Sequence, residues 1–474
     1  MAGMNMGLNV AFTEFMHEYS NNPYPSVSKR RDMLKQLKNM LKANGEELAA
    51  AIQADYCHRS KTESLFLEIY PSIKAIDYCL SHLRSWTKPR KKRVSWHFWP
   101  ASAYVLPQPV GVVGIIVPWN YPVFLSIVPL AYALAAGNRV LVKMSELSSE
   151  LGQVMQRLIS SLPTVSQFVK IIDGDVEVGR AFSSLPFGHL LFTGSTQVGR
   201  AVMASASKHL TPVTLELGGK SPAILSDGMN PAYLPRLFMG KLFNAGQTCI
   251  APDYLLVPAG LESYIESRFA EFINRHYPNL MANDNYTGII SLAHKQRLQE
   301  LVDDARQKGA RVVQFGQEIE TVQKIPVYLI FNVNSNMKVM HEEIFGPILP
   351  IMTYEKLADA IHFINSMPNP LALYYFGDDK DELKRLEYGT LSGALTINDT
   401  LMHVAIDDLP FGGVGQSGFG QYHGQEGFDR FSQLKPVFKK KRIATAAWLY
   451  PPYGKLIHWY LRYIAGINLG RNNE

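Results

Sequence analysis

Strand-like and helix-like patterns alternate between residues 110 and 217, and this alternation constrains the fold more than any other feature. Short β-branched and apolar runs are each followed, a few residues later, by a helical pattern. This order is typical of a doubly wound parallel sheet with helices on both faces. The expected strands are Val110–Val117, Arg139–Lys143, Val169–Ile172, His189–Thr193 and Thr214–Glu216, and the expected helices are Leu125–Ala136, Leu151–Leu162, Val176–Leu185 and Val198–Ser207.

A second alternating block, from Pro222 to about Ile397, predicts another α/β unit, and three amphipathic helices are expected before the first strand. Two such blocks fit a chain of 474 residues, which is long enough for two or three domains. The early helices are expected at Ser28–Ala43, at Glu46–Asp55 and after a capping box at Ser60; the later block should contain strands at 255–257 and 311–314 and helices at 262–275, 294–308 and 354–366.

Composition excludes several classes of protein. With 47% hydrophobic and 19% charged residues, the chain is expected to be globular. Three cysteines form no disulfide framework, and no Cys/His spacing predicts a metal site, so a reducing, cytoplasmic location is expected. The net charge of +6 is interpreted as spread along the chain, which argues against nucleic-acid binding. The first ten residues lack the order of a signal peptide.

Residues 95–138 contain no Asp, Glu, Lys or Arg and could be mistaken for a membrane-spanning segment. Prolines and glycines divide this stretch into pieces shorter than the roughly 20 residues that a spanning helix needs; those that do so are Pro107, Pro109, Pro118, Pro122, Pro129, Gly111 and Gly114. Its unalternating apolar runs instead favour strands that are buried on both faces of a parallel sheet.

Cys249 lies in Phe243–Ala251, a stretch of small residues between a helical pattern and a short strand that begins at Tyr254. A thiol placed in this way could act as a nucleophile, with backbone N–H groups nearby to bind an oxyanion. The alternative is a cysteine that only packs, as most free cysteines do. Cys57 and Cys79, in the N-terminal helices, are expected only to pack.

Three motifs follow strands of the first block. Phe192–Gly199 contains Gly194, Ser195 and Gly199 at a strand-to-helix turn, where N–H groups could bind phosphate. Lys143 and Glu146 could contact ribose hydroxyls, although a surface ion pair is the alternative. Glu216 and Leu217 precede two glycines that would let the backbone approach a ligand closely. Each motif alone is weak evidence.

Two further motifs come from other parts of the chain. Pro118–Pro122 presents Trp119 and the Asn120 amide directly after a buried strand. His341–Pro347 contains Glu343 and Phe345 before a Gly-Pro turn, and Phe345 stands where a zinc-binding His-Glu-x-x-His motif would need its second histidine.

Together these motifs resemble the aldehyde dehydrogenase superfamily, in the same order and at similar spacing, from about Lys29 to Phe438. The short N-terminus and the segments 54–60 and 76–78 are most similar to the coniferyl aldehyde dehydrogenase branch, which is close to the fatty-aldehyde and class 3 enzymes. Met144 replaces the proline that usually follows the lysine, a departure that fits this branch.

The resemblance implies a catalytic role for three residues. Cys249 would attack the aldehyde, Asn120 and the Cys249 N–H would form the oxyanion hole, and Glu216 would activate the water that hydrolyses the thioester. The substrate would be an aromatic aldehyde such as coniferyl aldehyde, or a medium- to long-chain aliphatic one.

The resemblance also implies NAD as cofactor. Lys143 and Glu146 would contact the adenosine ribose. The choice between NAD and NADP is left open by these residues, because Glu146 should repel a 2′-phosphate and Lys143 could attract one. The remaining expected cofactor contacts are Trp119, Gly194, Ser195, Gly199, Leu217, Glu343 and Phe345.

The implied organisation is an NAD(P)-binding domain, a catalytic domain and a small β arm that forms a homodimer. The tail reads as a helix over Lys455–Ile464 that could touch a membrane surface, cover a neighbouring substrate funnel or pack on its own body. The expected boundaries are 1–93 and 111–217 for the NAD(P)-binding domain, 218–398 for the catalytic domain, 94–110 and 431–442 for the oligomerisation arm, 399–430 for returning active-site loops and 443–474 for the aromatic and basic tail.

Three other functions are alternatives to an aldehyde dehydrogenase that releases free acids. A CoA-acylating dehydrogenase is disfavoured by Glu216, which predicts water as the acyl acceptor. A cysteine hydrolase would need His403 or His423 beside Cys249 and leaves the cofactor motifs unexplained. A non-catalytic protein of the same fold is disfavoured because nucleophile, amide and base are all present.

Overall fold

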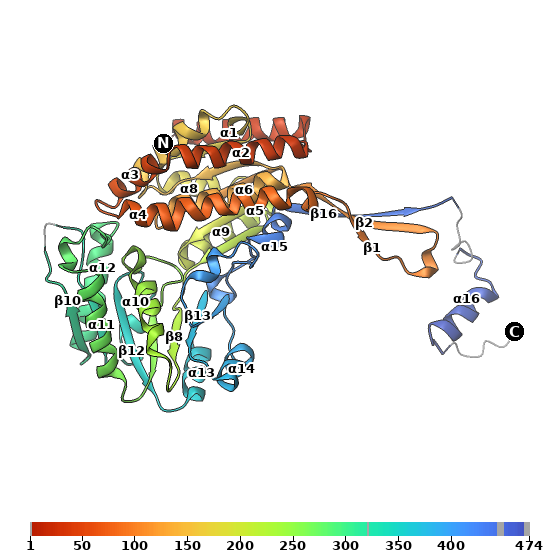
Figure 1. The fold of residues 1–474 in the computed structure, drawn as a ribbon. Coiled ribbons are helices and arrows are strands. Elements are labelled where there is room, and N and C mark those ends of the chain that lie inside the picture. The colour runs from red at the N-terminus through yellow and green to blue at the C-terminus, as the bar shows by residue number, and fades with distance from the viewer. Residues whose placement is uncertain (1, 320–321, 443–449, 469–474) are drawn as a thin grey trace.

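A computed structural model describes residues 2–319, 322–442 and 450–468. Two sheet-containing lobes form the body, and a long β arm projects from it, with a short helix beyond the tip of the arm (Figure 1). The three sheets have six, seven and three strands. The α/β fold predicted from the sequence is confirmed.

The first lobe is built on the six-stranded sheet, in the order β15-β7-β6-β3-β4-β5. Its five long strands are parallel, and the two-residue strand β15 (Gly418–Phe419) pairs antiparallel with β7 at one edge. The predicted alternation is confirmed, and the observed boundaries differ from the predicted ones by at most three residues. The elements are β3 (Val112–Ile116), α6 (Pro122–Ala136), β4 (Arg139–Lys143), α7 (Ser149–Ser160), β5 (Val169–Ile172), α8 (Val176–Ser183), β6 (His189–Gly194), α9 (Thr196–Ala206) and β7 (Val213–Leu217).

The uncharged stretch at 95–138 lies largely inside this lobe. Strand β3 is buried along most of its length, and every residue of α6 is buried. Because the sheet is covered on both faces, its strands and crossover helix need apolar residues all round. Within the described residues, no helix is both long enough and apolar enough to cross a bilayer.

The second lobe contains the seven-stranded sheet, in the order β10-β11-β12-β9-β8-β13-β14, in which only β10 is antiparallel. The helix predicted at 354–366 begins instead at Leu357, because Tyr354 still belongs to β12. The elements are β8 (Pro222–Leu225), α10 (Leu234–Leu242), β9 (Tyr254–Pro258), α11 (Glu262–His276), α12 (Leu292–Gln307), β10 (Arg311–Phe315), β11 (Val327–Phe331), β12 (Ile348–Tyr354), α13 (Leu357–Ser366), β13 (Ala372–Phe376), α14 (Lys380–Gly389) and β14 (Ala394–Ile397).

The N-terminal helices cover the first lobe (Figure 1). The three predicted helices are present, and the third continues through a π-helical turn at Leu65–Ile69. One helix was not predicted: α1 buries Leu8, Phe12 and Phe15 against the six-stranded sheet. Cys79 is buried as expected, but Cys57 is exposed in a turn, so the prediction that it packs was wrong. The helices are α1 (Ala2–Asn21), α2 (Val27–Ala43), α3 (Gly45–Asp55), α4 (Lys61–Ser64) and α5 (Tyr70–Trp86).

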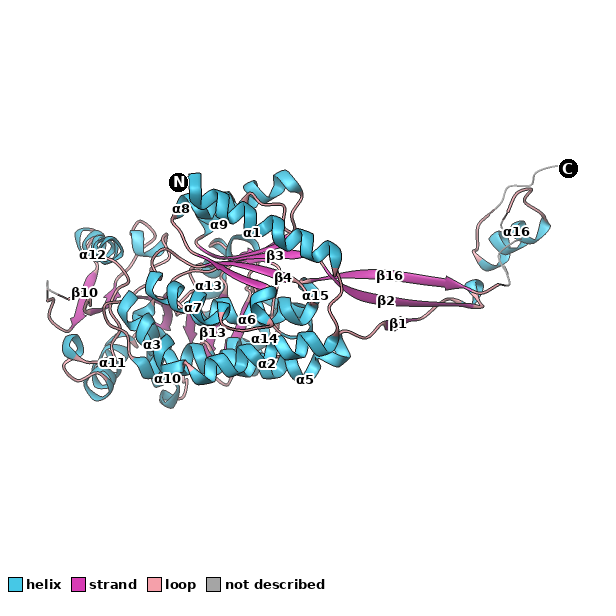
Figure 2. Ribbon diagram, turned by 90° about the horizontal axis from the view of Figure 1, so that it is seen from above, coloured by secondary structure: helices cyan, strands magenta, loops and turns pink. Residues whose placement is uncertain are grey.

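The arm is an antiparallel sheet of β1 (Arg90–Lys92), β2 (Ala101–Pro109) and β16 (Ser432–Lys440), with β2 in the middle. Strand β1 lies before residue 94, where the arm was expected to begin. Helix α15 (Gly424–Arg430) leads into β16. The tail helix is confirmed as α16 (Lys455–Trp459) followed by a π-helical turn to Ile464, and it lies beyond the arm, away from the body (Figure 2).

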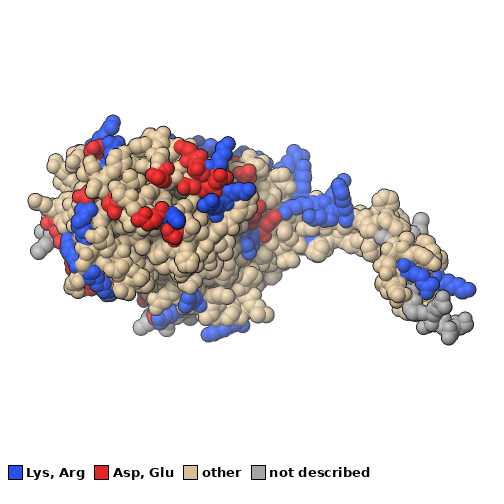
Figure 3. Space-filling view, turned by 90° about the horizontal axis from the view of Figure 1, so that it is seen from below, with Lys and Arg blue, Asp and Glu red and all other residues tan. Residues whose placement is uncertain are grey.

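Charge is unevenly distributed over the molecule. Residues 88–109, 431–442 and 450–468 hold twelve of the 47 Lys and Arg residues and none of the 41 Asp and Glu residues. The rest of the chain keeps 35 basic and 41 acidic residues, so it carries a net charge of −6 against +12 on the arm and tail. The interpretation of the charge as evenly spread was wrong, and acidic side chains are visible on the body but not on the arm (Figure 3).

Candidate active site

Cys249 lies in the turn between α10 and β9, as expected, and lines a cavity of about 250 Å³. The turn is made by three consecutive residues with left-handed backbone, Asn244, Ala245 and Gly246 (φ 52°, 51° and 76°). A side chain at Gly246 would collide with the carbonyl of Gly346, so this position needs glycine. The tight turn therefore brings the thiol to the cavity.

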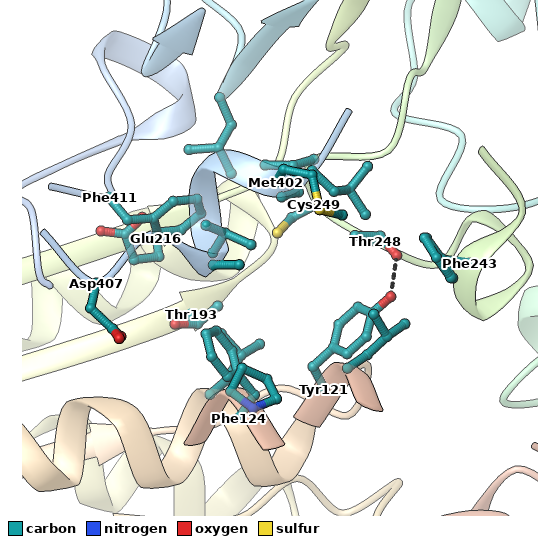
Figure 4. A pocket seen from close by; sticks show the side chains of 18 of the residues that line it. Tyr121, Phe124, Thr193, Glu216, Phe243, Thr248, Cys249, Met402, Asp407 and Phe411 are labelled. Carbon is teal, nitrogen blue, oxygen red and sulfur yellow. Dashed lines mark hydrogen bonds between the residues drawn. The ribbon is translucent and has the colours of Figure 1, made fainter. Parts of the chain in front are cut away.

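The cavity lies between the two lobes and has mostly apolar walls. Tyr121 and Phe124, at the start of α6, face Thr248 and Cys249 across it, and the Tyr121 hydroxyl is 2.8 Å from Thr248 Oγ1 (Figure 4). The other lining residues are Phe66, Leu67, Tyr70, Pro71, Lys74, Leu125, Thr193, Glu216, Leu217, Phe243, Ile250, Leu371, Leu401, Met402, Val404, Ala405, Asp407 and Phe411.

Glu216 reaches the same cavity from the end of β7 and is 2% exposed. Neither of its carboxylate oxygens has a hydrogen-bond partner among the described residues. Burial raises the pKa of Glu216 well above the usual value, with a small opposing effect from Arg430. A carboxyl group without protein partners that faces a cavity is suited to bind and deprotonate a water molecule.

Burial raises the pKa of the Cys249 thiol to about 12, and the negative charges of Glu343 and Glu216 contribute to the shift. At neutral pH the Cys249 thiol is therefore protonated. A neighbouring base or a positive charge is needed to make it a nucleophile.

Asn120 is buried directly after β3, and its side-chain Nδ2 donates to the carbonyl of Gln247, 3.3 Å away in the cysteine turn. This contact brings the amide within two residues of Cys249 along the chain. The second N–H of the amide is left for another acceptor, and Asn120 is not among the residues that line the cavity.

The predicted phosphate turn follows β6. Ser195 caps α9, and its hydroxyl accepts a hydrogen bond from the N–H of Val198. Gly199 packs on Leu217, at the end of neighbouring β7, so closely that a Cβ would lie 2.6 Å from Leu217 Cδ2. Gly194 is paired in register with Leu217, which places both at the carboxyl edge of the sheet. The N-terminus of α9 at this edge fits the pyrophosphate of a dinucleotide.

Lys143 ends β4 at the same edge. Its ammonium group is buried and donates to the carbonyls of Met144 (2.6 Å) and Gly174 (2.7 Å). Burial lowers the pKa of Lys143, and the charge of Glu146 opposes this shift. Glu146 itself is exposed beside it.

Trp119 and Phe345 contact each other, whereas Glu343 lies against the backbone that follows β7. The Trp119 and Phe345 rings are in edge contact, with centroids 5.3 Å apart. The Glu343 carboxylate lies against Gly218, where a Cβ would collide with it, and burial raises the pKa of Glu343 to about 8. This carboxylate therefore approaches the backbone that follows Glu216, and the residues present fit a dinucleotide between the two lobes.

The two histidines of the alternative hydrolase lie behind the cavity wall. His403 Nδ1 is 2.9 Å from Thr396 Oγ1, and the His423 ring stacks on Phe411 with no hydrogen bond to either nitrogen. Among the hydrogen bonds of the described residues, none joins either histidine to Cys249. Among the residues that the structure describes, no three His, Cys, Asp or Glu side chains lie close enough together to hold a metal ion.

The sequence interpretation missed one group of residues beside the site: Tyr56, Arg59, Glu63 and Glu68, which are buried against the Asn120 and Asn244 backbones. The only available signal was a cluster of charged residues just after a helix, which normally indicates a solvated surface.

This chain belongs to the aldehyde dehydrogenase family, whose model matches residues 20–437. Members of this family oxidise aldehydes to carboxylic acids with NAD(P)+, so the chain is an NAD(P)-dependent aldehyde dehydrogenase. The predicted family is confirmed.

Two relatives and one solved structure illustrate the similarity. A probable coniferyl aldehyde dehydrogenase from Pseudomonas aeruginosa is 49% identical over 95% of this chain and 94% of its own length. Aldehyde dehydrogenase family 3 member A2 from Pongo abelii is 40% identical over 89% and 87%. The substrate-bound structure of Staphylococcus aureus AldH superposes with a TM-score of 0.92 at 35% identity, covering 96% of this chain and 99% of that one.

Proposed function

We propose that this enzyme oxidises apolar aldehydes, either aromatic ones such as coniferyl aldehyde or medium- to long-chain aliphatic ones, through a thioester on Cys249. The observation that carries the proposal is that an unpaired carboxylate, Glu216, and the Cys249 thiol line one largely apolar cavity. The name of the Pseudomonas aeruginosa relative supports an aromatic substrate.

In the first step the Cys249 thiolate attacks the aldehyde carbon and the carbonyl oxygen becomes an oxyanion. The Cys249 N–H and the free N–H of the Asn120 amide stabilise that charge. When bound, a nicotinamide cofactor would accept the hydride. Loss of hydride from the thiohemiacetal restores the C=O bond and leaves an acyl group on the sulfur of Cys249.

In the second step Glu216 takes a proton from a water molecule, which attacks the thioester carbonyl. The C–S bond then breaks, the Cys249 thiolate leaves, and the carboxylic acid is released. The unpaired position of Glu216 in the cavity favours water over coenzyme A as acyl acceptor.

For the cofactor, Lys143 and Glu146 would contact the adenosine ribose, and Gly194, Ser195 and Gly199 the phosphates. Trp119, Leu217, Glu343 and Phe345 would enclose the nicotinamide half. NAD+ is the proposed cofactor because the exposed carboxylate of Glu146 would repel a 2′-phosphate. We assign residues 1–93 and 111–217 to the cofactor domain and 218–398 to the catalytic domain.

The arm is proposed to form a homodimer, because β16 is an edge strand with exposed apolar side chains at Leu434 and Phe438. The tail helix exposes Leu456, Trp459 and Tyr463, which would cover the substrate entrance of a partner or make weak contact with a membrane surface. We propose a cytoplasmic enzyme that is at most peripheral to a membrane.

The test is NADH formation across a panel of aromatic and aliphatic aldehydes, with and without coenzyme A. Wild type should produce NADH and free acid without coenzyme A, and Cys249→Ala should lower kcat/KM by at least about 10³-fold because the nucleophile is gone. Cys79→Ala is the matched control and should keep its activity, since Cys79 is buried in α5. Wild-type rates in Cys249→Ala would contradict the mechanism.

A further inference from the structure

A buried polar network lies directly behind the proposed oxyanion hole, and no step of the mechanism uses it. Tyr56 is the C-cap residue directly after α3, and Arg59, Glu63 and Glu68 follow within the next twelve residues. Tyr56, Arg59 and Glu68 are each 1% exposed or less. A buried arginine with two carboxylates is costly to desolvate, so its position calls for an explanation.

Three donors converge on one backbone oxygen, the carbonyl of Asn120. They are the Tyr56 hydroxyl at 3.1 Å, Arg59 Nη1 at 3.0 Å and Asn244 Nδ2 at 3.1 Å. A carbonyl has two lone pairs, so three donors within hydrogen-bond distance exceed its usual number of partners and restrict where this oxygen can lie. Fixing the Asn120 backbone also fixes the point from which its side-chain amide reaches towards the cysteine turn.

The Glu68 carboxylate binds backbone N–H groups shortly after Asn120, at the start of α6. Its Oε1 accepts from Arg59 Nη1 at 2.8 Å, and its Oε2 accepts from the N–H groups of Val123 (2.8 Å) and Phe124 (3.3 Å). These are free N–H groups at the start of the fifteen-residue helix α6. Glu68 thus anchors the helix that follows Asn120.

The network reaches the cysteine turn through Glu63 and Asn244. Glu63 Oε1 accepts from the N–H of Asn244 at 2.9 Å and lies 3.6 Å from Arg59 Nε. Asn244 Nδ2 also lies 3.1 Å from the Tyr56 hydroxyl and 3.1 Å from the Gln247 carbonyl, so its two N–H groups are shared among three acceptors. Gln247 is also the residue that the Asn120 side chain contacts. Arg59 therefore links the loop that carries Asn120 with the turn that carries Cys249.

We propose that Tyr56, Arg59 and Glu68 are positioning residues that hold the Asn120 amide in line with the Cys249 N–H, so that both donors meet the same oxyanion. This role rests on the proposed function of Cys249 and Asn120. A general stabilising role explains the network less well, because buried ion pairs contribute little net stability and every backbone group bound here belongs to these two loops or to the start of α6.

The test uses two reactions of Cys249 that need no cofactor. With p-nitrophenyl acetate, the thiolate attacks the ester carbonyl, nitrophenolate leaves, and an oxyanion forms on the way to the acetyl thioester. With iodoacetamide, the thiolate displaces iodide at a saturated carbon and no oxyanion forms. Only the first reaction depends on the position of the Asn120 amide. Peptide mass spectrometry separates Cys249 from the exposed Cys57 in both reactions.

Tyr56→Phe removes the hydroxyl that contacts Asn120 and Asn244 and leaves the ring in place. We expect acetylation of Cys249 to slow by about tenfold, less than the 10²–10³-fold that follows complete removal of an oxyanion donor, while alkylation stays within about twofold of wild type. The matched control is Tyr286→Phe, another buried tyrosine whose hydroxyl donates to a backbone carbonyl, Ile325 at 2.8 Å; it should change neither rate.

An equal fall in both rates of Tyr56→Phe would indicate disruption of the whole turn and overturn the positioning role, and so would two unchanged rates. Cys249→Ala separates this failure from that of the proposed function. If wild type acetylates through Cys249 and Tyr56→Phe matches it, only the positioning role fails. If Cys249→Ala releases nitrophenolate as fast as wild type, the proposed function fails and the positioning role fails with it.

Discussion

Two residues at the reaction centre must act without their protons, and the structure raises the pKa of both. For Cys249 the causes are burial and then the charges of Glu343 and Glu216; for Glu216 the cause is burial. A base and a nucleophile whose pKa values are raised become more active as the pH rises, and the Cys249 pKa of about 12 lies well above neutral pH. The reaction should therefore accelerate from neutral to alkaline pH.

The first prediction concerns the thiol alone. Between pH 7 and 9, well below the Cys249 pKa of about 12, the thiolate fraction and hence the alkylation rate should rise about tenfold per pH unit. Glu343→Gln removes a negative charge that raises this pKa, and because the pKa of Glu343 is about 8 that charge is present mainly above pH 8, so there the variant should react faster than wild type, which is a shift of its profile to lower pH. Peptide-resolved iodoacetamide kinetics without cofactor measure both profiles. A shift to higher pH in Glu343→Gln would contradict the electrostatic account.

At the scale of single residues, the sequence could predict site residues that follow strands, because ligands bind at the carboxyl ends of the strands of a parallel sheet. Glu216 and Lys143 were singled out in this way, whereas Cys249 was singled out from a stretch of small residues between a helical pattern and a strand. Tyr56 and Arg59 were not, because their partner Asn120 is more than 60 residues away in the chain and nothing in the local pattern joins them. Residues that act through a distant backbone carbonyl leave no periodic signal.

At the scale of elements, hydrophobic periodicity predicted the five parallel strands of the first sheet and their helices to within three residues, but only β9, β10, α11, α12 and α13 in the second lobe. Two of the elements that were not predicted escaped for different reasons. Helix α1 carries its apolar face at Leu8, Ala11, Phe12 and Phe15, a helical spacing from which it could have been predicted. Strand β1 consists of Arg90, Lys91 and Lys92, whose charges resemble a solvated surface although their backbone pairs with β2.

The second prediction concerns β16. Leu434 and Phe438 lie on one face of this edge strand and are 37% and 55% exposed, an arrangement that a partner protomer would cover. Leu434→Glu combined with Phe438→Glu should convert the proposed dimer into a monomer, measured as a halved mass by light scattering. Lys439→Glu, on the opposite face, is the charge-matched control and should stay dimeric. A dimer in both variants would mean that another surface holds the protomers together.

At the scale of the whole molecule, the tail stands apart from the body that carries the reaction (Figure 2). Its helix exposes Leu456, Trp459, Tyr463 and Ile464, and none of its residues lines the cavity of the same chain. A role in substrate entry therefore requires a second protomer or a surface.

The third prediction follows from this position. A chain that stops after Arg442 should lose turnover of long or aromatic aldehydes and keep turnover of short ones, because only large substrates would contact an apolar cover. Steady-state kinetics on hexadecanal, coniferyl aldehyde and propanal, with matched enzyme concentrations, measure the difference. Equal losses on all three would count against a role in substrate entry.

The separation of charge between body and extension gives each protomer a large electric dipole moment, with its positive end at the arm and tail. Two equal dipoles that lie side by side attract each other when they are antiparallel, and a twofold axis across their length produces that arrangement. This attraction would favour a pairing in which the basic arm of one protomer faces the acidic body of the other, against the repulsion of two net charges of +6. The association rate should accordingly depend on ionic strength, because added salt shortens the Debye length and screens both effects.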